Sequence, residues 1–486
     1  MIFNSEFIIR NNKKYFLAKE IKLSACNKIE KKCYQALELA YFAVKNQTDI
    51  YCSSQIEGVF LELAKNVQVN IPVQYKKNTI LHVCTELYKS GGHTRCLTRW
   101  ISDLSEFEHD CVILDQKSEL PLDFLNCINK SGSKVFNLTP LKSILKKASK
   151  LRIIASAYEY IILHIHMNDP VPIVAFGVNE FKRPVIYFNH ADHLFWLGVS
   201  ICDWCFDLNN VGHDLTVKRR GISRSSILGI PFVENKYIDS HMPKKSDKKI
   251  LFSSGNKNKF SSYDGKDFFD LVDIILSEEP DVYWIVIGHD LHSYKSNFLT
   301  KKFGKRFIIY SELAYSEYLE KLKSAYLVID SYPVGGGTAL LDAVSLNIPF
   351  FTLCSFQSDA VVKSFGFCSD FAEFKNKVVM VLNDFSYRNI LLENEDFLIK
   401  SMYGNEKWKN TCKNILSKLN SHKVYSFKSI NNCNVSLAAK ITCRWVSGKS
   451  LFKSLFEFRF RRKKIIIVFC GKILAFKERL WKFPII

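Results

Sequence analysis

The sequence predicts an α/β protein with two doubly wound, Rossmann-like domains, a helical region before them and a basic tail after them. Short apolar runs, typical of buried parallel strands, alternate with helical patterns through most of the chain. This series stops in a polar, lysine-rich stretch around 242–249 and then starts again. The length of 486 residues suits two or three domains, each with its own core.

The composition excludes a disordered or fibrous chain, because 47% of the residues are hydrophobic and 24% are charged. The formal charge of +20 indicates a partner of negative sign, which leaves nucleic acid, anionic lipid and a phosphorylated substrate open. Fifteen cysteines without a framework of spacings predict reduced thiols. We find no leader pattern and no run of 18 apolar residues, so we expect a cytoplasmic protein without a transmembrane helix.

The first region, 1–76, is predicted to be helical. Apolar residues recur at helical spacing between about residues 28 and 68, which predicts an αα-hairpin. The two apolar stripes are Ala36, Leu37, Leu39, Ala40 and Phe42, and then Phe60, Leu61, Leu63 and Ala64.

Two strand–helix series follow, in the predicted domains 77–241 and 242–425, before the tail 426–486. The candidate strands of the first domain are 79–84, 111–114, 134–136, 160–164 and 185–188. Those of the second domain are 250–252, 282–287, 307–310, 326–330 and 349–353. In sheets of this kind ligands bind at the carboxyl ends of the strands, so the loops after these runs are where we expect function.

The most informative of these loops follows Asp330. Three consecutive glycines come after this strand end, and a helix begins near Thr338. Glycines let the backbone approach a ligand closely, and a helix N-terminus attracts anions, which predicts a diphosphate site. Asp342, one turn further, is a candidate for a ribose hydroxyl. The alternative is a glycine-rich turn without a ligand, since neither the P-loop nor the GxGxxG pattern is present.

This segment, 330–344 followed by Asn347-Ile348-Pro349, resembles the donor-binding segment of GT-B glycosyltransferases, most closely the O-GlcNAc transferase type. The segment 251–260 resembles the first strand and loop of that family's C-terminal domain, where a lysine pairs with the nucleotide diphosphate. The resemblance spans roughly 78–415 and implies two Rossmann-like domains facing a cleft. The donor-binding residues it implies are Lys257, Lys259, Asp330, Gly335, Gly336, Gly337, Thr338 and Asp342.

The resemblance also implies an activity. It implies transfer of a sugar from a nucleotide-diphosphate donor, UDP-linked, to a hydroxyl of a glycan, a lipid-linked glycan or a protein, without a cofactor or a bound metal. The Glu-x7-Glu signature of many retaining enzymes is absent near 357–366, which favours an inverting reaction. Two alternatives stay open: a nucleotide-sugar epimerase of the same fold, and a catalytically silent subunit that docks at a membrane.

A second glycine-rich loop follows the first strand and contains Gly91, Gly92, His93 and Arg95. The resemblance implies that this loop faces the donor. An imidazole suits proton abstraction near neutral pH, so His93 is the candidate general base. Arg95 is a candidate phosphate partner. The alternatives are a polar loop histidine without a role and an exposed arginine at a helix start.

Further histidines follow two consecutive candidate strands. They are expected to converge on the cleft, where His190 is a second catalytic candidate. Contact with the sugar or acceptor, a metal site and structural hydrogen bonding are the alternatives, although the spacing matches no zinc pattern. Cys202 and Cys205 form a single CxxC pair, which we interpret as structural. The cleft candidates of these two loops are His164, His166, His190, Asp192 and His193.

The tail carries nearly half of the excess charge. Between Lys449 and Ile486 there are eleven lysines and arginines but only two acidic residues, and the basic residues alternate with aromatic and aliphatic ones. This pattern predicts docking on an anionic membrane surface, peripheral on the inner face of the cytoplasmic membrane. The alternative is a helix packed on the body. Nucleic acid is not expected as a partner, because no recognised binding module is present.

Overall fold

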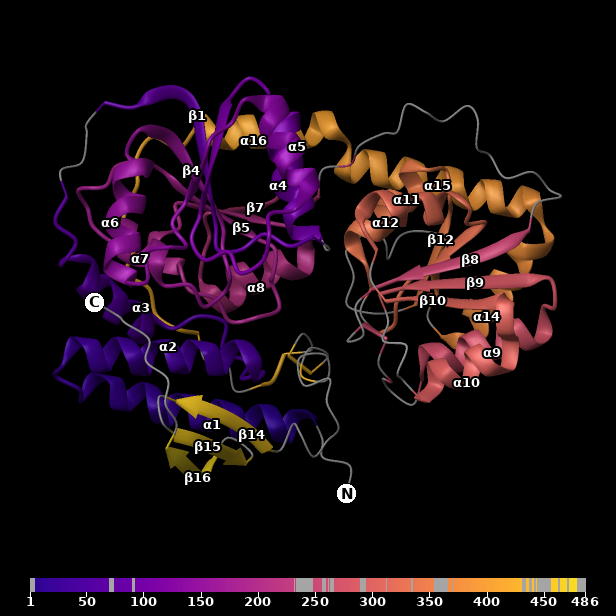
Figure 1. Cartoon of the computed structure of the whole chain (residues 1–486), viewed down its shortest axis with the longest axis horizontal. Helices are drawn as coiled ribbons and strands as arrows, with labels where there is room; N and C mark the ends of the chain where they lie inside the picture. Colours follow the sequence, from indigo (N-terminus) through magenta and orange to yellow (C-terminus); the bar gives the residue numbers. More distant parts are fainter. Residues whose placement is uncertain are drawn as a thin grey trace. The chain divides into compact units, whose positions relative to one another are not determined.

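The computed structural model describes most of the chain, which forms two compact units (Figure 1). Unit 1 contains Met1–Tyr88, His93–Leu228 and Thr411–Ile486, and unit 2 contains Lys89–Gly92 and Gly229–Asn410. The described residues are 5–69, 74–89, 92–230, 232, 248–255, 259–260, 262, 266–288, 294–311, 313–333, 335–353, 366–368, 370–430, 434–436, 439–440, 443, 456–461, 464–469 and 472–478.

Unit 1 is built on a seven-stranded parallel sheet in the order β3-β2-β1-β4-β5-β6-β7. The predicted strands of the first domain are confirmed, whereas β6 and β7 were not predicted because they are short and partly polar. The strands are β1 (Lys76–Cys84), β2 (Glu108–Ile113), β3 (Val135–Asn137), β4 (Tyr158–His164), β5 (Val185–Asn189), β6 (Trp204–Asp207) and β7 (Ser225–Ile227). The helices between them are α4 (Gly92–Asp103), α5 (Leu122–Ser131), α6 (Ile144–Ala155), α7 (Val171–Phe176) and α8 (Asn210–Arg220).

The N-terminal region consists of three helices, α1 (Ser5–Ser24), α2 (Ile29–Lys45) and α3 (Ser54–Ala64). The predicted hairpin of about residues 28–68 corresponds to α2 and α3, and α1 is an additional helix of the region that was predicted to be helical. The apolar residues of α1 are too sparse for a clear helical stripe.

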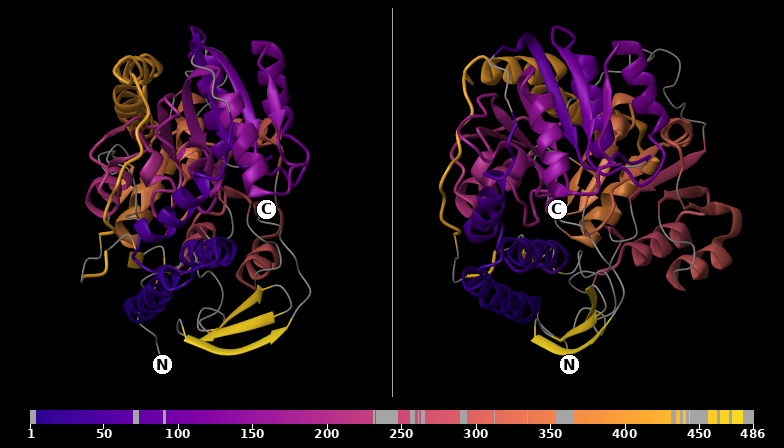
Figure 2. Two further views of the ribbon diagram at one scale, coloured as in Figure 1. Left: turned by 90° about the vertical axis from the view of Figure 1, so that its left-hand side faces the viewer. Right: turned by 60° about the vertical axis from the view of Figure 1, so that its left-hand side comes forward.

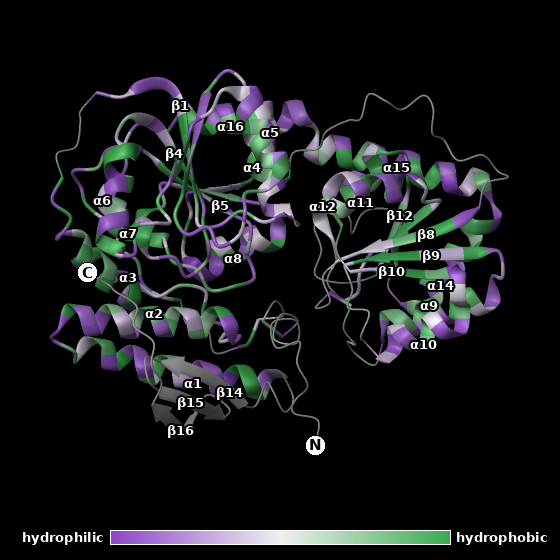
Figure 3. Cartoon of the chain, viewed as in Figure 1, coloured by the Kyte–Doolittle hydropathy of each residue, from purple (hydrophilic) through white to green (hydrophobic). Residues whose placement is uncertain are grey.

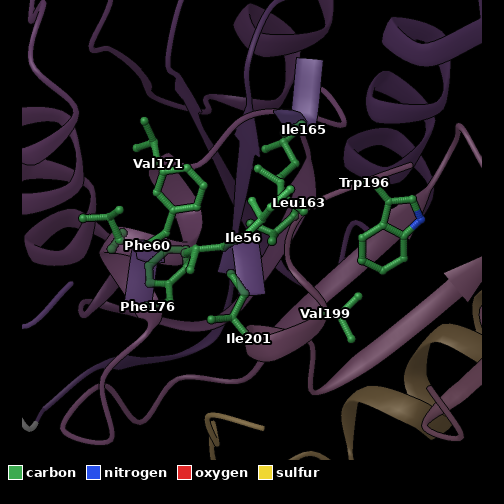
Figure 4. Close-up of a cluster of buried hydrophobic side chains, with 14 of the residues drawn as sticks. Ile56, Phe60, Leu163, Ile165, Val171, Phe176, Trp196, Val199 and Ile201 are labelled. Atoms are coloured by element: carbon green, nitrogen blue, oxygen red, sulfur yellow. The ribbon is translucent and has the colours of Figure 1, made fainter. Parts of the chain in front are cut away.

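These helices are an integral part of unit 1 and not an appendage. Ile56 and Phe60 of α3 pack in one core with Leu163 of β4 (Figure 4). The buried carboxylate of Glu57 accepts hydrogen bonds from the backbone N–H groups of three consecutive residues, Gly198, Val199 and Ser200, at 2.8, 3.0 and 2.8 Å.

Unit 2 is built on a six-stranded parallel sheet in the order β10-β9-β8-β11-β12-β13. The predicted strands are confirmed, and β13 is an additional short edge strand. The strands are β8 (Lys249–Ser254), β9 (Val282–Ile287), β10 (Phe307–Tyr310), β11 (Leu327–Ile329), β12 (Phe350–Leu353) and β13 (Phe367–Cys368). The helices are α9 (Phe268–Glu278), α10 (Tyr294–Phe303), α11 (Tyr315–Lys323), α12 (Gly337–Ser345), α14 (Phe371–Asn383), α15 (Phe385–Tyr403) and α16 (Asn405–Leu416), which leads into the last part of unit 1.

Both faces of this sheet are buried, which explains why its strands are continuous apolar runs. In β9, Trp284 and Val286 enter the core shared with α9 and α14, whereas Ile285 and Ile287 enter the core shared with α11, α12 and α15. Figure 1 shows α11, α12 and α15 on one side of the sheet and α9, α10 and α14 on the other, and Figure 3 shows that the strands are its most hydrophobic part. Figure 2 gives two further views of unit 1, with helices beside its strands. Because all six strands of unit 2 are parallel, their carboxyl ends lie at one edge of the sheet, and the loops that follow them gather there.

The tail contains three described strands, β14 (Phe456–Arg461), β15 (Lys464–Phe469) and β16 (Lys472–Glu478). They form an antiparallel sheet, so the alternative of a packed helix is wrong for these residues. In β14 aromatic and charged residues alternate with period two, which favours a strand over a helix. Over the described part of the chain, none of the helices combines the length and apolar character needed to span a bilayer.

Candidate functional site

The glycine-rich loop of unit 2 is closed by the carboxylate of Asp330, which directly follows β11. Oδ1 accepts hydrogen bonds from the backbone N–H groups of Ser331 and Gly336, both at 2.8 Å, and Oδ2 accepts one from Thr352 Oγ1 at 3.0 Å. Burial raises the pKa of Asp330, while the Gly336 N–H and the charge of Lys259 act in the opposite direction. The side chain thus folds the glycine segment back towards the start of α12.

Lys259 brings a positive charge to the same loop. Its Nζ donates a hydrogen bond to the backbone oxygen of Gly335 at 2.8 Å. The other lysine implied by the resemblance, Lys257, lies outside the described residues. Of the two candidates, Lys259 therefore has a defined position beside the glycines.

The loop also leaves little room for larger residues. A Cβ atom on Gly336 would lie 3.2 Å from the Cβ of Ala339 and 3.5 Å from Asp330 Oδ1. Gly337 and Thr338 form the first turn of α12, where backbone N–H groups and the helix dipole favour an anion. This end of unit 2 has the chemistry of a phosphate site.

Asp342, the candidate for contact with a ribose hydroxyl, is more deeply buried than this role suggests. Its side chain is 2% exposed, and Oδ1 accepts a hydrogen bond from the Tyr315 hydroxyl at 3.0 Å. Tyr315, in the first turn of α11, was not predicted as a site residue. Tyr315 is half-buried, whereas Asp342 is buried.

In unit 1, His93 is oriented by a backbone carbonyl. Its Nε2 lies 3.1 Å from the oxygen of His164. Since a carbonyl oxygen only accepts hydrogen bonds, the proton is assigned to Nε2 and the lone pair to Nδ1. Among the residues that the structure describes, the buried Nδ1 has no hydrogen-bond partner. His93 therefore presents an unused acceptor nitrogen.

The two predicted histidine loops meet beside His93. His164 ends β4 and His190 follows β5, and these strands are neighbours. The ring of His93 lies 4.4 Å from that of His190 and 6.3 Å from that of His164. His166 is held nearby, with Nε2 at 2.8 Å from the Tyr88 hydroxyl and the two rings stacked.

Asp192 and His193 belong to a different network. Asp192 Oδ1 lies 3.1 Å from His193 Nδ1, and its Oδ2 accepts a hydrogen bond from Asn209 at 3.3 Å. Arg220 donates to the backbone oxygen of Asp192 at 2.7 Å. These contacts tie the loop to α8 and correspond to the structural alternative.

The remaining candidates of the first glycine loop lie at the start of α4. Gly92 is its first residue and Arg95 is half-buried in its first turn. Gly91 lies outside the described residues.

Two further histidines, His82 in β1 and His109 in β2, were not predicted as site residues. His82 Nδ1 lies 3.0 Å from His164 Nε2, and its Nε2 lies 3.0 Å from His109 Nδ1. His109 Nε2 donates a hydrogen bond to the oxygen of Leu104 at 2.9 Å. A histidine in the middle of an apolar strand was the available signal, because burying a polar group requires a partner.

Burial keeps these imidazoles neutral. It lowers the pKa of His82, His164 and His190 well below the ordinary value, and that of His93 to about 4. Over the described ranges, no three His, Cys, Asp or Glu side chains are grouped in a way that could hold a metal ion.

This burial predicts a loss of stability of unit 1 in mild acid. Because the folded chain favours neutral histidines, the stabilisation is complete above about pH 6.5 and is lost as the pH falls towards about 4. We expect amide hydrogen exchange in β1 and β4, corrected for the intrinsic rate, to accelerate at least about tenfold over this range. The strands β8 and β9 contain no histidine and serve as the internal control. Equal acceleration in both pairs of strands would contradict this origin.

Comparison with known proteins gives matches at the level of structure. No protein-family model and no curated protein sequence matches the chain. Anabaena HepE, solved in complex with UDP and glucose, is 14% identical with a TM-score of 0.53, covering 70% of this chain and 100% of HepE. TarM is 10% identical with a TM-score of 0.54, covering 71% and 99%. An S. aureus TarM mutant, solved with fondaparinux, α-GlcNAc-glycerol and UDP, is 10% identical with a TM-score of 0.53, covering 70% and 100%.

These similarities establish the fold. The two parallel sheets with interleaved helices form a two-domain GT-B architecture, as predicted from the sequence.

Proposed function

We propose that the chain is a glycosyltransferase that moves a sugar from a UDP-linked donor to a hydroxyl group of an acceptor. The observation that carries this proposal is the loop of unit 2, where Asp330 folds three glycines towards α12 and Lys259 places its ammonium beside them. The solved complexes of HepE and of the TarM mutant with UDP support UDP as the nucleotide.

Unit 2 stabilises the leaving group in this proposal. As the bond between the sugar and the diphosphate breaks, negative charge grows on UDP. Lys259 and the N–H groups at the start of α12, including that of Thr338, offset this charge without a metal ion or a cofactor.

Unit 1 supplies the base. His93 Nδ1, which burial keeps unprotonated at neutral pH by lowering the pKa of His93 to about 4, takes the proton of the acceptor hydroxyl while the oxygen forms its bond to the sugar carbon and the bond from that carbon to UDP breaks. Direct attack by the acceptor makes the reaction inverting. His190, whose ring packs against His93, and His166 are proposed to contact the acceptor.

The acceptor is proposed to be a glycan, a lipid-linked glycan or a protein, within polysaccharide biosynthesis. The basic tail is proposed to hold the enzyme at the anionic inner face of the cytoplasmic membrane. Flotation with vesicles containing phosphatidylglycerol tests this part, and equal binding to neutral vesicles would contradict it.

The donor site is tested by replacing Gly336 with valine. The Cβ would crowd the Cβ of Ala339 at 3.2 Å, and the two methyl groups of valine add bulk to the loop, so we expect the Kd for UDP, measured by calorimetry, to rise at least about 30-fold, or roughly 2 kcal/mol. Gly58→Val is the matched control, since a Cβ there has no neighbour within 4 Å. Unchanged UDP affinity in a folded Gly336→Val chain would remove the phosphate site.

Product analysis separates the proposed reaction from the two alternatives. A transferase forms a glycosylated acceptor, an epimerase returns a modified sugar, and a silent subunit releases no UDP from any nucleotide sugar.

A further inference from the structure

Three buried histidines cross the sheet of unit 1 in a diagonal row, which we call the histidine row: His109 of β2, His82 of β1 and His164 of β4. In the strand register His109 lies opposite Ile80 and His164 lies opposite Cys84, so His82 stands between them. None of the three is more than 5% exposed. Buried polar networks are costly unless every member is satisfied, which makes such a row in an apolar sheet unusual.

The hydrogen bonds give the row a direction. The oxygen of Leu104 can only accept, so His109 carries its proton on Nε2 and offers Nδ1 as an acceptor. His82 therefore donates from Nε2 to His109, which leaves its own Nδ1 to accept from Nε2 of His164. Each neutral ring thus has its proton on Nε2, and the three ring dipoles point the same way.

The open end of the row lies at the carboxyl edge of the sheet. His164 Nδ1 is left with a lone pair and, within the described residues, is buried without a partner. The backbone oxygen of His164 accepts a hydrogen bond from Nε2 of His93. The Nδ1 of His93 therefore also has a lone pair and, within the described residues, is buried without a partner. Two bare acceptor nitrogens therefore occur in rings whose centroids lie 6.3 Å apart.

We propose that the histidine row fixes Nδ1 of His164 as a hydrogen-bond acceptor, as the backbone oxygen of His164 does for Nδ1 of His93, and that His93 Nδ1 receives the reacting hydroxyl of the acceptor while His164 Nδ1 receives a second hydroxyl of the same acceptor. This inference rests on the proposed function, and it makes His82 and His109 positioning residues that touch no substrate. The aligned dipoles place the negative end of the row near His93, where a positive charge develops as the base takes its proton.

The protonation pattern is tested directly by long-range 1H–15N spectra of the full chain with 15N-labelled histidine rings, assigned by single replacements. At pH 7.5 we expect His82, His109 and His164 each to carry one proton, on Nε2. A proton on Nδ1 of His164 would overturn the proposal, whether or not the chain has any transferase activity.

The catalytic consequence is tested with two variants of His109. In His109→Gln the carboxamide can still donate to Leu104 and accept from His82, whereas His109→Leu removes both contacts. We expect UDP release from UDP-glucose, UDP-galactose or UDP-N-acetylglucosamine to slow about 10- to 100-fold in the leucine variant and to stay within about threefold in the glutamine variant, both with unchanged UDP affinity.

His422→Gln is the matched control. His422 is also buried in unit 1, but it contacts Asp203 and Phe176 and lies outside the row. Equal losses in His109→Gln and His109→Leu, or an equal loss in the control, would overturn the positioning role. Absence of UDP release from all three sugars in the wild-type chain would instead contradict the proposed function and its hydroxyl site, while the spectra would still decide the direction of the row.

Discussion

Replacing Lys259 with methionine is expected to lower turnover of the UDP-sugar about 100- to 1000-fold. Methionine keeps the apolar stem of the side chain but removes the ammonium that lies beside Gly335. Since charge on the diphosphate grows as the sugar bond breaks, the loss should be larger in kcat than in the affinity for UDP. Single-turnover rates and UDP calorimetry on the same preparation separate the two effects.

Lys301→Met is the matched control for this prediction. Lys301 is an exposed lysine on α10 of the same unit, so its replacement removes the same charge away from the glycine loop. We expect its turnover to stay within about twofold of the wild type, as for an exposed charge. If both lysine variants lost the same activity, general electrostatic attraction of the donor would explain the effect, and the local role of Lys259 would be wrong.

The strands of both sheets could be predicted because a parallel strand buried on both faces is a continuous apolar run. Three of the missed elements, β7, β13 and α1, lack this pattern, and β6 is a run of only four residues. β7 is Ser-Ser-Ile at a sheet edge, β13 has two residues, and α1 buries only a few widely spaced side chains. Their formation depends on contacts with the rest of the unit, which a local pattern does not contain.

The same difference between local patterns and long-range contacts explains which parts of the candidate site could be predicted. The loop after Asp330 could be found because the strand end, the glycines and the helix start are adjacent in the sequence. The histidine row could not, because His82 and His164 are separated by many residues and meet only through the strand order β2-β1-β4 and its register. The pairing of Tyr315 with Asp342 was missed for the same reason, since it joins α11 to α12.

Replacing His93 with glutamine is expected to lower kcat about 100- to 10,000-fold and to leave the Kd for UDP unchanged. The glutamine amide can still donate to the backbone oxygen of His164, so the loop keeps its hydrogen bond, but no basic nitrogen takes the place of Nδ1. UDP affinity should persist because the glycines and Lys259 that are proposed to bind it belong to unit 2. Steady-state kinetics and calorimetry measure the two quantities separately.

The glutamine variant separates chemistry from structure, which His93→Ala cannot do, because alanine removes the base and the hydrogen bond together. His422→Gln is the control: His422 is buried in unit 1 and bonds to Asp203 and to the backbone oxygen of Phe176, so its replacement should leave kcat within about twofold. Full activity of His93→Gln together with loss of activity in His93→Ala would mean that His93 contributes its hydrogen bond to His164 and is not the base. The base would then have to be one of the neighbouring imidazoles. His190 is the first candidate, because its ring lies 4.4 Å from that of His93.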